Sequence, residues 1–466
     1  MNDTAKLGAT AAIARFVSEL SSNDIPVDAI EKAKMVIADS FACILSGVGS
    51  ELAPTMLAYL DEAPGGTVPV LGTSRCATPQ LAALVTGTFA AALDYDDLMT
   101  PVHPSAVVVT ALCCALGNRP VSGRRFIEAY IVGIEIGAKV AQAIGRGHSG
   151  RGFHATATLC GFSSFAAIAY LKGLPAEQIE LGLGVVATNS GGLLCSLGTM
   201  AKPFHSGLAA RLAVDAEALT RLGFTASPIA IEAERGFFAA YGDEGSNASL
   251  IEGSLGKPWA VIDPGATLKR FPSCIAGHRA MAAVIDLKKQ GATAQNVESV
   301  DVAVAPGALQ PLMYPNPKTG LESKFSMQYA VAAAFLSDAL GIATFETDAT
   351  QRFSVRDLMA RIHAWEDPQQ AVEDPVSANL SWGYRGYARV TVRLKDGRVL
   401  EKQVDVPPGH PSNPLDWQDI ENKMHDCAAS AGLPVHETER ALSALRTLET
   451  LSDMSGLIDA MTGVKR

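Results

Sequence analysis

The sequence has few aromatic residues and fewer basic than acidic ones. Of its 466 residues 6% are aromatic, and 38 Lys and Arg stand against 48 Asp and Glu, so the formal net charge is -10. Nucleic-acid phosphates are bound by clustered Lys and Arg, and single strands usually need stacking rings as well. We therefore expect no nucleic-acid partner.

Cysteines at the spacing of a metal site are also missing. The eight cysteines are scattered through apolar segments, and Cys113 and Cys114 are adjacent instead of being spaced as a metal pair. We interpret most of them as buried, reduced and inert, because free cysteine behaves as a small apolar residue.

Two further absences concern targeting and membranes. Segment 1–15 has no basic region followed by an apolar core, so we predict no secretory signal and a cytoplasmic protein. The uncharged run 98–118 contains Pro101, His103 and Pro104. These residues predict a loop followed by a buried core helix, so we expect no membrane partner.

Apolar residues at helical spacing dominate the first part of the chain. Hydrophobic residues make up 48% of the sequence, enough to bury a large core. We predict helices at residues 9–20, 26–47, 79–93, 106–116, 123–144, 155–171 and 177–194, and one reaching about Leu222. Residues 1–262 are therefore predicted to form an all-helical domain.

The pattern changes after residue 262. Valines alternate at 300, 302 and 304, and segments 387–394 and 398–404 flank Asp396-Gly397, a strong hairpin signal. Helical segments near 276–290, 325–338 and 355–361 accompany them, so residues 263–408 are predicted to form a smaller α+β domain. Residues 409–466 are helical again and are expected to rejoin the helical domain. The predicted fold class is mainly α with a smaller α+β domain.

One segment, residues 198–211, combines cationic groups with small residues. It reads Gly-Thr-Met-Ala-Lys-Pro-Phe-His-Ser-Gly-Leu-Ala-Ala-Arg. Leucines at 208, 212, 219 and 222 predict an inward helix face, and Lys202 and His205 are placed in an irregular lead-in. In a chain of negative net charge, these groups indicate a local site for an anion, although a solvated lysine and an ordinary helix-start histidine are the alternative.

Four other segments carry polar residues at loops or helix ends. They are Asp94-Tyr95-Asp96-Asp97 followed by His103, the Phe153-His154 pair, the Lys269-Arg270 pair, and Tyr314 before Pro315. Taken singly, each is more often structural, and the acidic run is equally typical of a solvated loop. Joined, they offer the groups needed to abstract a proton from a carboxylate-bearing substrate.

In their order and amino-acid sequence, these segments resemble motifs of the MmgE/PrpD family. The motifs are Asp-Tyr-Asp-Asp…His-Pro-Ser, Gly-Phe-His-Ala-Thr, the 198–211 segment, Lys-Arg-Phe-Pro-Ser-Cys and Lys-Phe-Ser-Met-Gln-Tyr-Ala. The family includes 2-methylcitrate dehydratase, cis-aconitate decarboxylase and iminodisuccinate epimerase. The resemblance implies a large helical domain, a smaller α+β domain over an active-site cleft, and a homodimer that needs no cofactor or metal.

The resemblance also implies roles for individual residues. Lys202 and Lys269 would hold substrate carboxylates, with His205 and Arg270 as further substrate-binding groups. His103 and His154 would be the acid/base groups. Tyr314 would be the proton donor, and Asp94 would orient a histidine. Leu98 departs from the decarboxylase pattern, which has a threonine there.

We therefore predict a cofactor-independent lyase or isomerase that acts on a small di- or tricarboxylate. Dehydration, decarboxylation and epimerisation next to a carboxylate all remain open. One alternative is a metal-dependent hydrolase that uses Asp94, Asp96, Asp97 and His103. Another is a helical binding protein without enzymatic activity.

Overall fold

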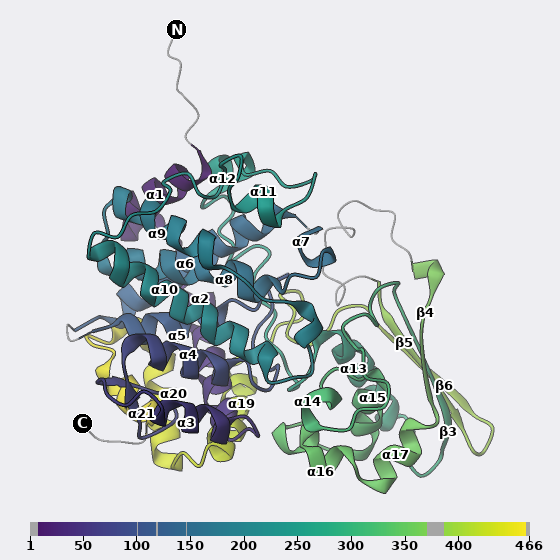
Figure 1. Ribbon diagram of the computed structural model, residues 1–466. Helices are drawn as coiled ribbons and strands as arrows, with labels where there is room; N and C mark the ends of the chain where they lie inside the picture. Colours follow the sequence, from purple (N-terminus) through teal and green to yellow (C-terminus); the bar gives the residue numbers. More distant parts are fainter. Residues whose placement is uncertain (1–7, 100, 118–119, 146, 371–385, 463–466) are drawn as a thin grey trace.

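The computed structural model describes residues 8–99, 101–117, 120–145, 147–370 and 386–462. A helical body contains the early helices and the C-terminal helices, and an α+β unit of helices and a sheet lies beside it (Figure 1). The predicted fold class, mainly α with a smaller α+β part, is confirmed.

The body begins with helices, most of which follow the predicted bounds within a few residues, while those at 53–61, 147–150, 237–241 and 249–254 were not predicted. The helices are α1 Ala9–Glu19, α2 Val27–Val48, α3 Ala53–Asp61, α4 Pro79–Ala90, α5 Ser105–Ala115, α6 Gly123–Ile144, α7 Gly147–Gly150, α8 Ala155–Lys172, α9 Ala176–Asn189, α10 Ala201–Arg221, α11 Phe237–Tyr241 and α12 Ser249–Ser254. Thr78 caps α4 and Ser122 caps α6, each accepting a hydrogen bond from a first-turn amide. Helices α4, α5 and α8 are buried over most of their length and form the interior of the body.

Helix α10 departs from the prediction in two ways. It begins at Ala201, so Lys202 and His205 lie in its first two turns and not in an irregular lead-in. Of the four predicted inward leucines, Leu212 and Leu219 are partly buried against the core, whereas the prediction is wrong for Leu208 and Leu222, which are 38% and 76% exposed. Small residues face α4 instead, and a Cβ on Gly207 would lie 2.1 Å from the Leu84 carbonyl oxygen. This close approach seats α10 on α4.

The α+β unit is built on a four-stranded sheet of order β4-β3-β5-β6. Its strands are β3 Val297–Val304, β4 Ile362–Glu366, β5 Ala388–Leu394 and β6 Val399–Val404, and its helices include α13 His278–Lys289, α14 Gly320–Ser323, α15 Met327–Leu336, α16 Thr347–Thr350 and α17 Phe353–Met359. The predicted hairpin at Asp396-Gly397 is confirmed, because β5 and β6 pair antiparallel across it. Strand β4, which the sequence did not predict, pairs parallel with β3.

The C-terminal helices α19 Trp417–Ser430, α20 Val435–Arg446 and α21 Ser455–Thr462 pack on the body. Asp416 caps α19 in a capping box with Asp419. Ile420 and Met424 are buried in the same hydrophobic cluster as α2 and α4. A second cluster takes its residues from 271–394, within the α+β unit.

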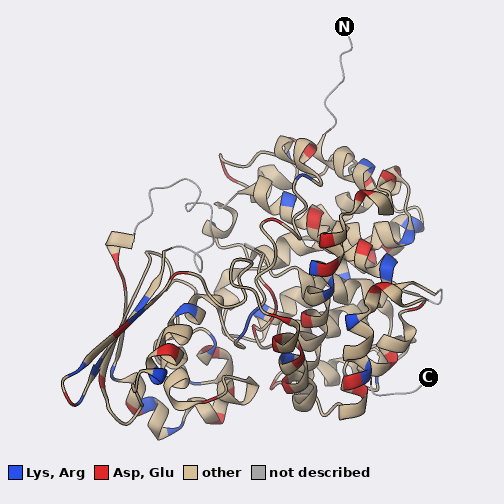
Figure 2. Ribbon diagram, turned by 180° about the vertical axis from the view of Figure 1, so that it is seen from behind, with Lys and Arg blue, Asp and Glu red and all other residues tan. Residues whose placement is uncertain are grey.

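Among the described residues, no single helix is long and apolar enough to cross a membrane. Helices α2 and α3 reach the needed length and apolarity only as a pair, and the chain bends by 82° between them. Acidic and basic residues are interspersed along the helices and the sheet (Figure 2).

Candidate functional site

The site is centred on Asp94, in the turn after α4. Lys202 of α10 approaches one carboxylate oxygen with its Nζ at 2.7 Å, and Lys269 approaches the other at 2.9 Å. Lys269 also donates to the backbone carbonyl of Asp94 at 2.7 Å. Asp94 has a positive φ of 50°, a conformation that costs energy in a residue with a Cβ. The two lysines, both buried, hold this turn in place.

Mutual attraction favours the charged forms of Asp94 and Lys202. Burial alone would raise the pKa of Asp94, but the ammonium groups of Lys202 and Lys269 lower it well below its usual range. Burial opposes the charge on Lys202, yet Asp94 and Asp96 raise its pKa above the ordinary value. The two lysines thus face the Asp94 carboxylate directly, and the Asp96 carboxylate acts on Lys202 from nearby.

His103 lies beside the acidic turn with one ring nitrogen engaged. Its Nδ1 donates to the carbonyl of Asp97 at 2.8 Å, and the same nitrogen is 3.7 Å from Oδ2 of Asp96. Because a carbonyl can only accept, Nε2 of the neutral ring keeps its lone pair. Burial lowers the pKa of His103 to about 4, with Lys269 and Lys202 adding to the effect and Asp96 opposing it. His103 is therefore a neutral base at pH 7.

His103 is contacted by Asp96 and Asp97, the neighbours of Asp94, and not by Asp94 itself, which was predicted to orient a histidine. The carboxylate oxygens of Asp94 are taken by the two lysines. The reason is geometric, because the turn at Asp94 directs its carboxylate toward α10.

His154 and His205 form a pair at the start of α8 and α10. Their Nδ1 atoms are 3.0 Å apart, so one must donate and the other accept. Burial lowers the pKa of both rings, and the positive charge of Lys202 lowers both further. Neutral imidazoles thus line one side of the lysine pair.

Tyr314 and Arg270, the remaining predicted residues, are placed differently. Tyr314 donates its hydroxyl to the Leu197 carbonyl at 2.9 Å, and a Cβ on Gly198 would lie 2.5 Å from its ring. It therefore packs on the segment that leads into α10. The predicted substrate-binding role of Arg270 is not matched by its geometry, since its half-exposed guanidinium pairs with Asp419 at 3.8 Å.

Cys274 and His278, which the sequence analysis gave no role, lie near the site. Asp94 and Lys269 act electrostatically on both Cys274 and His278. Burial raises the pKa of the Cys274 thiol to about 11, so it is neutral. Cys274 ends the motif that contains Lys269, and that proximity was the available signal.

The metal-hydrolase alternative has no ligand set among the described residues. Asp94 pairs with lysines, and Asp97 accepts hydrogen bonds from the amide and hydroxyl of Ser105 at 3.1 and 2.6 Å. Asp96 is fully buried, and neither of its oxygens has a hydrogen-bond partner within the described ranges. In the part of the chain that the structure describes, no group of three His, Cys, Asp or Glu side chains could hold a metal ion.

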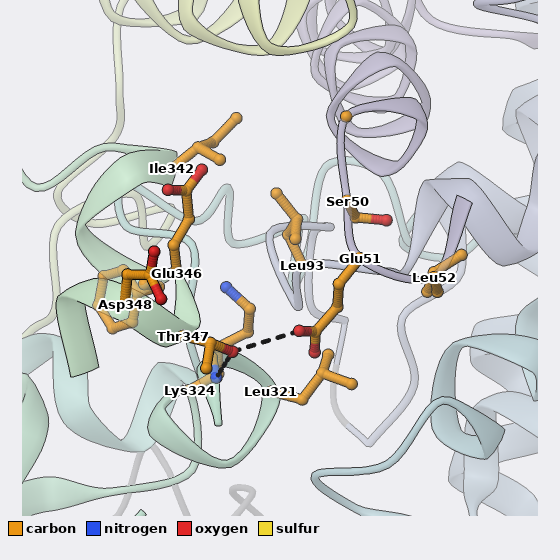
Figure 3. Close-up of a pocket in the computed structure, with 13 residues that line it drawn as sticks. Ser50, Glu51, Leu52, Leu93, Leu321, Lys324, Ile342, Glu346, Thr347 and Asp348 are labelled. Atoms are coloured by element: carbon orange, nitrogen blue, oxygen red, sulfur yellow. Dashed lines mark hydrogen bonds between the residues drawn. The ribbon is translucent and has the colours of Figure 1, made fainter. Parts of the chain in front are cut away.

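Two cavities flank the site. One, of about 350 Å³, is lined by His205 together with Gly191, Gly192 and Arg211. The other, of about 340 Å³, lies between the body and the α+β unit, where Leu93 precedes Asp94 in sequence. Figure 3 shows the Lys324 side chain in this second cavity, between the acidic side chains of Glu51 and Glu346. Asp94 and its two lysines line neither cavity.

Comparison with known proteins supports a relationship over almost the whole chain. The human cis-aconitate decarboxylase (Homo sapiens) is 26% identical over 395 residues, which cover 83% of this chain and 80% of the relative. The mouse cis-aconitate decarboxylase (Mus musculus) is 25% identical, over 97% of this chain and 93% of the relative. That of Aspergillus terreus is 25% identical, over 99% and 97%.

The family models agree with the two-part structure. Residues 11–248 match the MmgE/PrpD N-terminal domain, and residues 271–450 match the MmgE/PrpD C-terminal domain. The first match covers most of the helical body and the second includes the whole sheet. The chain therefore belongs to the MmgE/PrpD family, as its motifs predicted.

Proposed function

We propose that this protein is a lyase that removes CO2 from cis-aconitate or a closely related small tricarboxylate without a cofactor. The observation that carries the proposal is the convergence of Lys202 and Lys269 on Asp94 at 2.7 and 2.9 Å, beside neutral histidines. The names of the relatives support decarboxylation over dehydration or epimerisation as the first reaction to test.

The lysines would hold the substrate by its carboxylates once the buried cluster opens toward it, because Lys202 and Lys269 line neither of the two cavities. As the bond to the departing carboxylate breaks, its electron pair stays on the substrate carbon and spreads toward a neighbouring carboxylate. The ammonium groups of Lys202 and Lys269 stabilise this growing charge, and they do so more strongly in a buried site than in water. CO2 leaves, and one proton must be added to the carbon.

The proton would come from His103 or His154. Both imidazoles are neutral in the free protein, because burial lowers their pKa. A bound polyanion favours the imidazolium form and raises the pKa of an adjacent histidine. Substrate binding would therefore favour protonation of the adjacent imidazole, which later donates this proton to the substrate carbon.

The same proposal includes a homodimer, as the family resemblance implies. Leu193, Met200 and Leu208 are 53%, 42% and 38% exposed around the start of α10, and such apolar residues suit an interface. Light scattering on the purified protein measures the mass directly, and a monomer at micromolar concentration would contradict this part of the proposal.

Proton NMR in D2O tests the reaction. The purified protein is incubated with cis-aconitate, citrate, 2-methylcitrate or iminodisuccinate in separate samples. Decarboxylation gives a new dicarboxylate with one deuterium, elimination gives an alkene without loss of carbon, and epimerisation gives exchange at the α carbon. Elimination or epimerisation alone would replace the proposed reaction, and four unchanged spectra would reject it.

A further inference from the structure

Lys423, a buried lysine of α19, donates hydrogen bonds to backbone carbonyls of the two segments that carry Asp94 and Lys269. Nζ of Lys423 lies 2.6 Å from Oδ1 of Asp39 on α2, 2.8 Å from the carbonyl of Tyr95 and 3.3 Å from the carbonyl of Lys269. An ammonium group has three N–H donors, and each has an acceptor here. The charge also lies 3.8 Å from the centre of the Tyr95 ring.

These contacts join the two segments that carry the site. Tyr95 follows Asp94 directly, and Lys269 is the residue whose side chain holds Asp94. Nearby, the amides and carbonyls of Leu98 and Thr267 pair with each other at 2.9 Å in both directions. Lys423 therefore closes a ring of contacts through both segments, and Asp39 balances its charge.

Removing such a group would loosen the site without touching a substrate. Asp94 has the positive φ, and a conformation of this kind persists only where neighbouring contacts hold it. Near the reacting atoms, displacements of about 1 Å can cost roughly 100-fold in rate.

We infer that Lys423, paired with Asp39, is a positioning residue that sets the geometry between Asp94 and Lys269. The consequence for turnover rests on the proposed function, whereas the consequence for backbone order does not. The C-terminal helices thus contribute to the site through α19.

The test compares Lys423→Met with a matched control, Lys139→Met. Lys139 is also buried, lies 3.6 Å from Glu135 and donates to the Pro258 carbonyl at 3.1 Å, away from the site segments. Both variants break a buried ion pair, so both are expected to melt at a lower temperature. The double variant Asp39→Asn with Lys423→Met removes the unpaired carboxylate and serves if the single variant fails to fold.

Two measurements separate positioning from general stability. Hydrogen exchange followed by mass spectrometry should show the amides of Leu98, Thr267 and Leu268 exchanging at least about 10-fold faster in Lys423→Met, but not in Lys139→Met. With cis-aconitate, kcat should fall about 100-fold in Lys423→Met with a smaller change in KM, and Lys139→Met should keep the wild-type kcat.

The outcomes are distinguishable from those of the proposed function. Equal exchange at these amides in both variants would overturn the positioning role, whatever the activity. If the wild-type protein turns over no tricarboxylate, the proposed function fails, and the exchange comparison still decides the role of Lys423.

Discussion

Asp94 with its two lysines is an arrangement that stability alone does not favour. Burying three charged groups costs several kcal/mol for each ion before their attraction offsets it. Lys269 is fully buried and Lys202 is 4% exposed. A buried cluster of charged groups at the junction of two parts of the molecule is typical of a functional site.

We expect Lys202→Met to lower kcat/KM for cis-aconitate by roughly 10- to 1,000-fold, because truncating one member of a buried charge pair costs about 2–4 kcal/mol. Steady-state kinetics measures this change. Lys172→Met is the control, since Lys172 pairs with Glu217 farther along α10 at 2.8 Å. A Lys202→Met enzyme as active as the control would contradict the assigned role.

His103 makes the stability of the protein depend on pH. Its pKa is about 4 in the folded protein and about 6.5 in an unfolded chain. Between these values the unfolded chain binds the extra proton, so the contribution of His103 to the free energy of unfolding is lost as the pH falls from 7 to 4.

The variant His103→Gln lacks this dependence and should gain stability relative to wild type as the pH falls. Urea titrations at pH 7, 5.5 and 4.5 measure the difference. Asp97, whose pKa burial raises to about 7, acts in the opposite direction in both proteins, so its contribution cancels in the comparison. A difference that is constant with pH would mean that the folded pKa of His103 is near 6.5.

At the scale of elements, the contact of α4 with α10 places the site. Gly87 and Gly207 face each other, and a Cβ on Gly87 would lie 2.9 Å from the Cα of Gly207. The helices can approach this closely only because both residues lack a side chain. The contact brings Lys202 and His205, which lie five and two residues before Gly207 on α10, toward the turn after α4.

We expect Gly207→Ala to lower the free energy of unfolding by about 1–3 kcal/mol, because the added methyl overpacks the contact, and to reduce activity by moving Lys202. Gly253→Ala in α12 is the matched control, since no atom of the described residues lies within 4 Å of the place that its added methyl would take. Thermal melting and kinetics on both variants check this. Equal melting temperatures would show that α10 has room to move.

At the scale of the whole molecule, the site lies where two hydrophobic cores meet. Leu268 belongs to the cluster of the body, and Phe271 belongs to that of the α+β unit. Lys269 lies between them. Lys324 occupies the cavity on the other side of this junction, where burial lowers its pKa to about 7 and its ammonium donates to the Pro272 carbonyl at 3.3 Å.

Replacing this lysine should therefore stabilise the protein at neutral pH. The pKa of an unfolded lysine is about 10.4, so burial of Lys324 destabilises the fold most at and below pH 7, and the penalty shrinks as the pH rises toward 10. We expect a higher melting temperature for Lys324→Met than for wild type at pH 7, with a smaller difference at pH 9.5.

The control for Lys324 is Lys288→Met in the same unit. Lys288 is partly exposed and donates to the carbonyls of Ala334 and Ser337 at 3.2 and 2.8 Å. Its replacement should therefore not raise the melting temperature. A destabilised Lys324→Met protein at pH 7 would show that the buried ammonium is well solvated or paired.

The fold class, the bounds of most long helices of the body and the hairpin at Asp396-Gly397 follow from the sequence alone. These features depend on local patterns, namely helical periodicity, caps and turn residues, which act over a few residues. The ordered motifs also predicted family membership. Strand β4 was missed, because it pairs in parallel with a strand about 60 residues away and has no turn signal of its own.

Which side chains meet at the site depends on how distant segments pack. The face of α10 that contacts α4 carries small residues, since the depth of this packing depends on Gly87 and Gly207 together, and Leu208 and Leu222 are exposed. Asp94 binds lysines instead of a histidine, and Lys423 reaches the site from 328 residues along the chain. Such contacts join segments distant in sequence, and local periodicity and spacing carry no information about them.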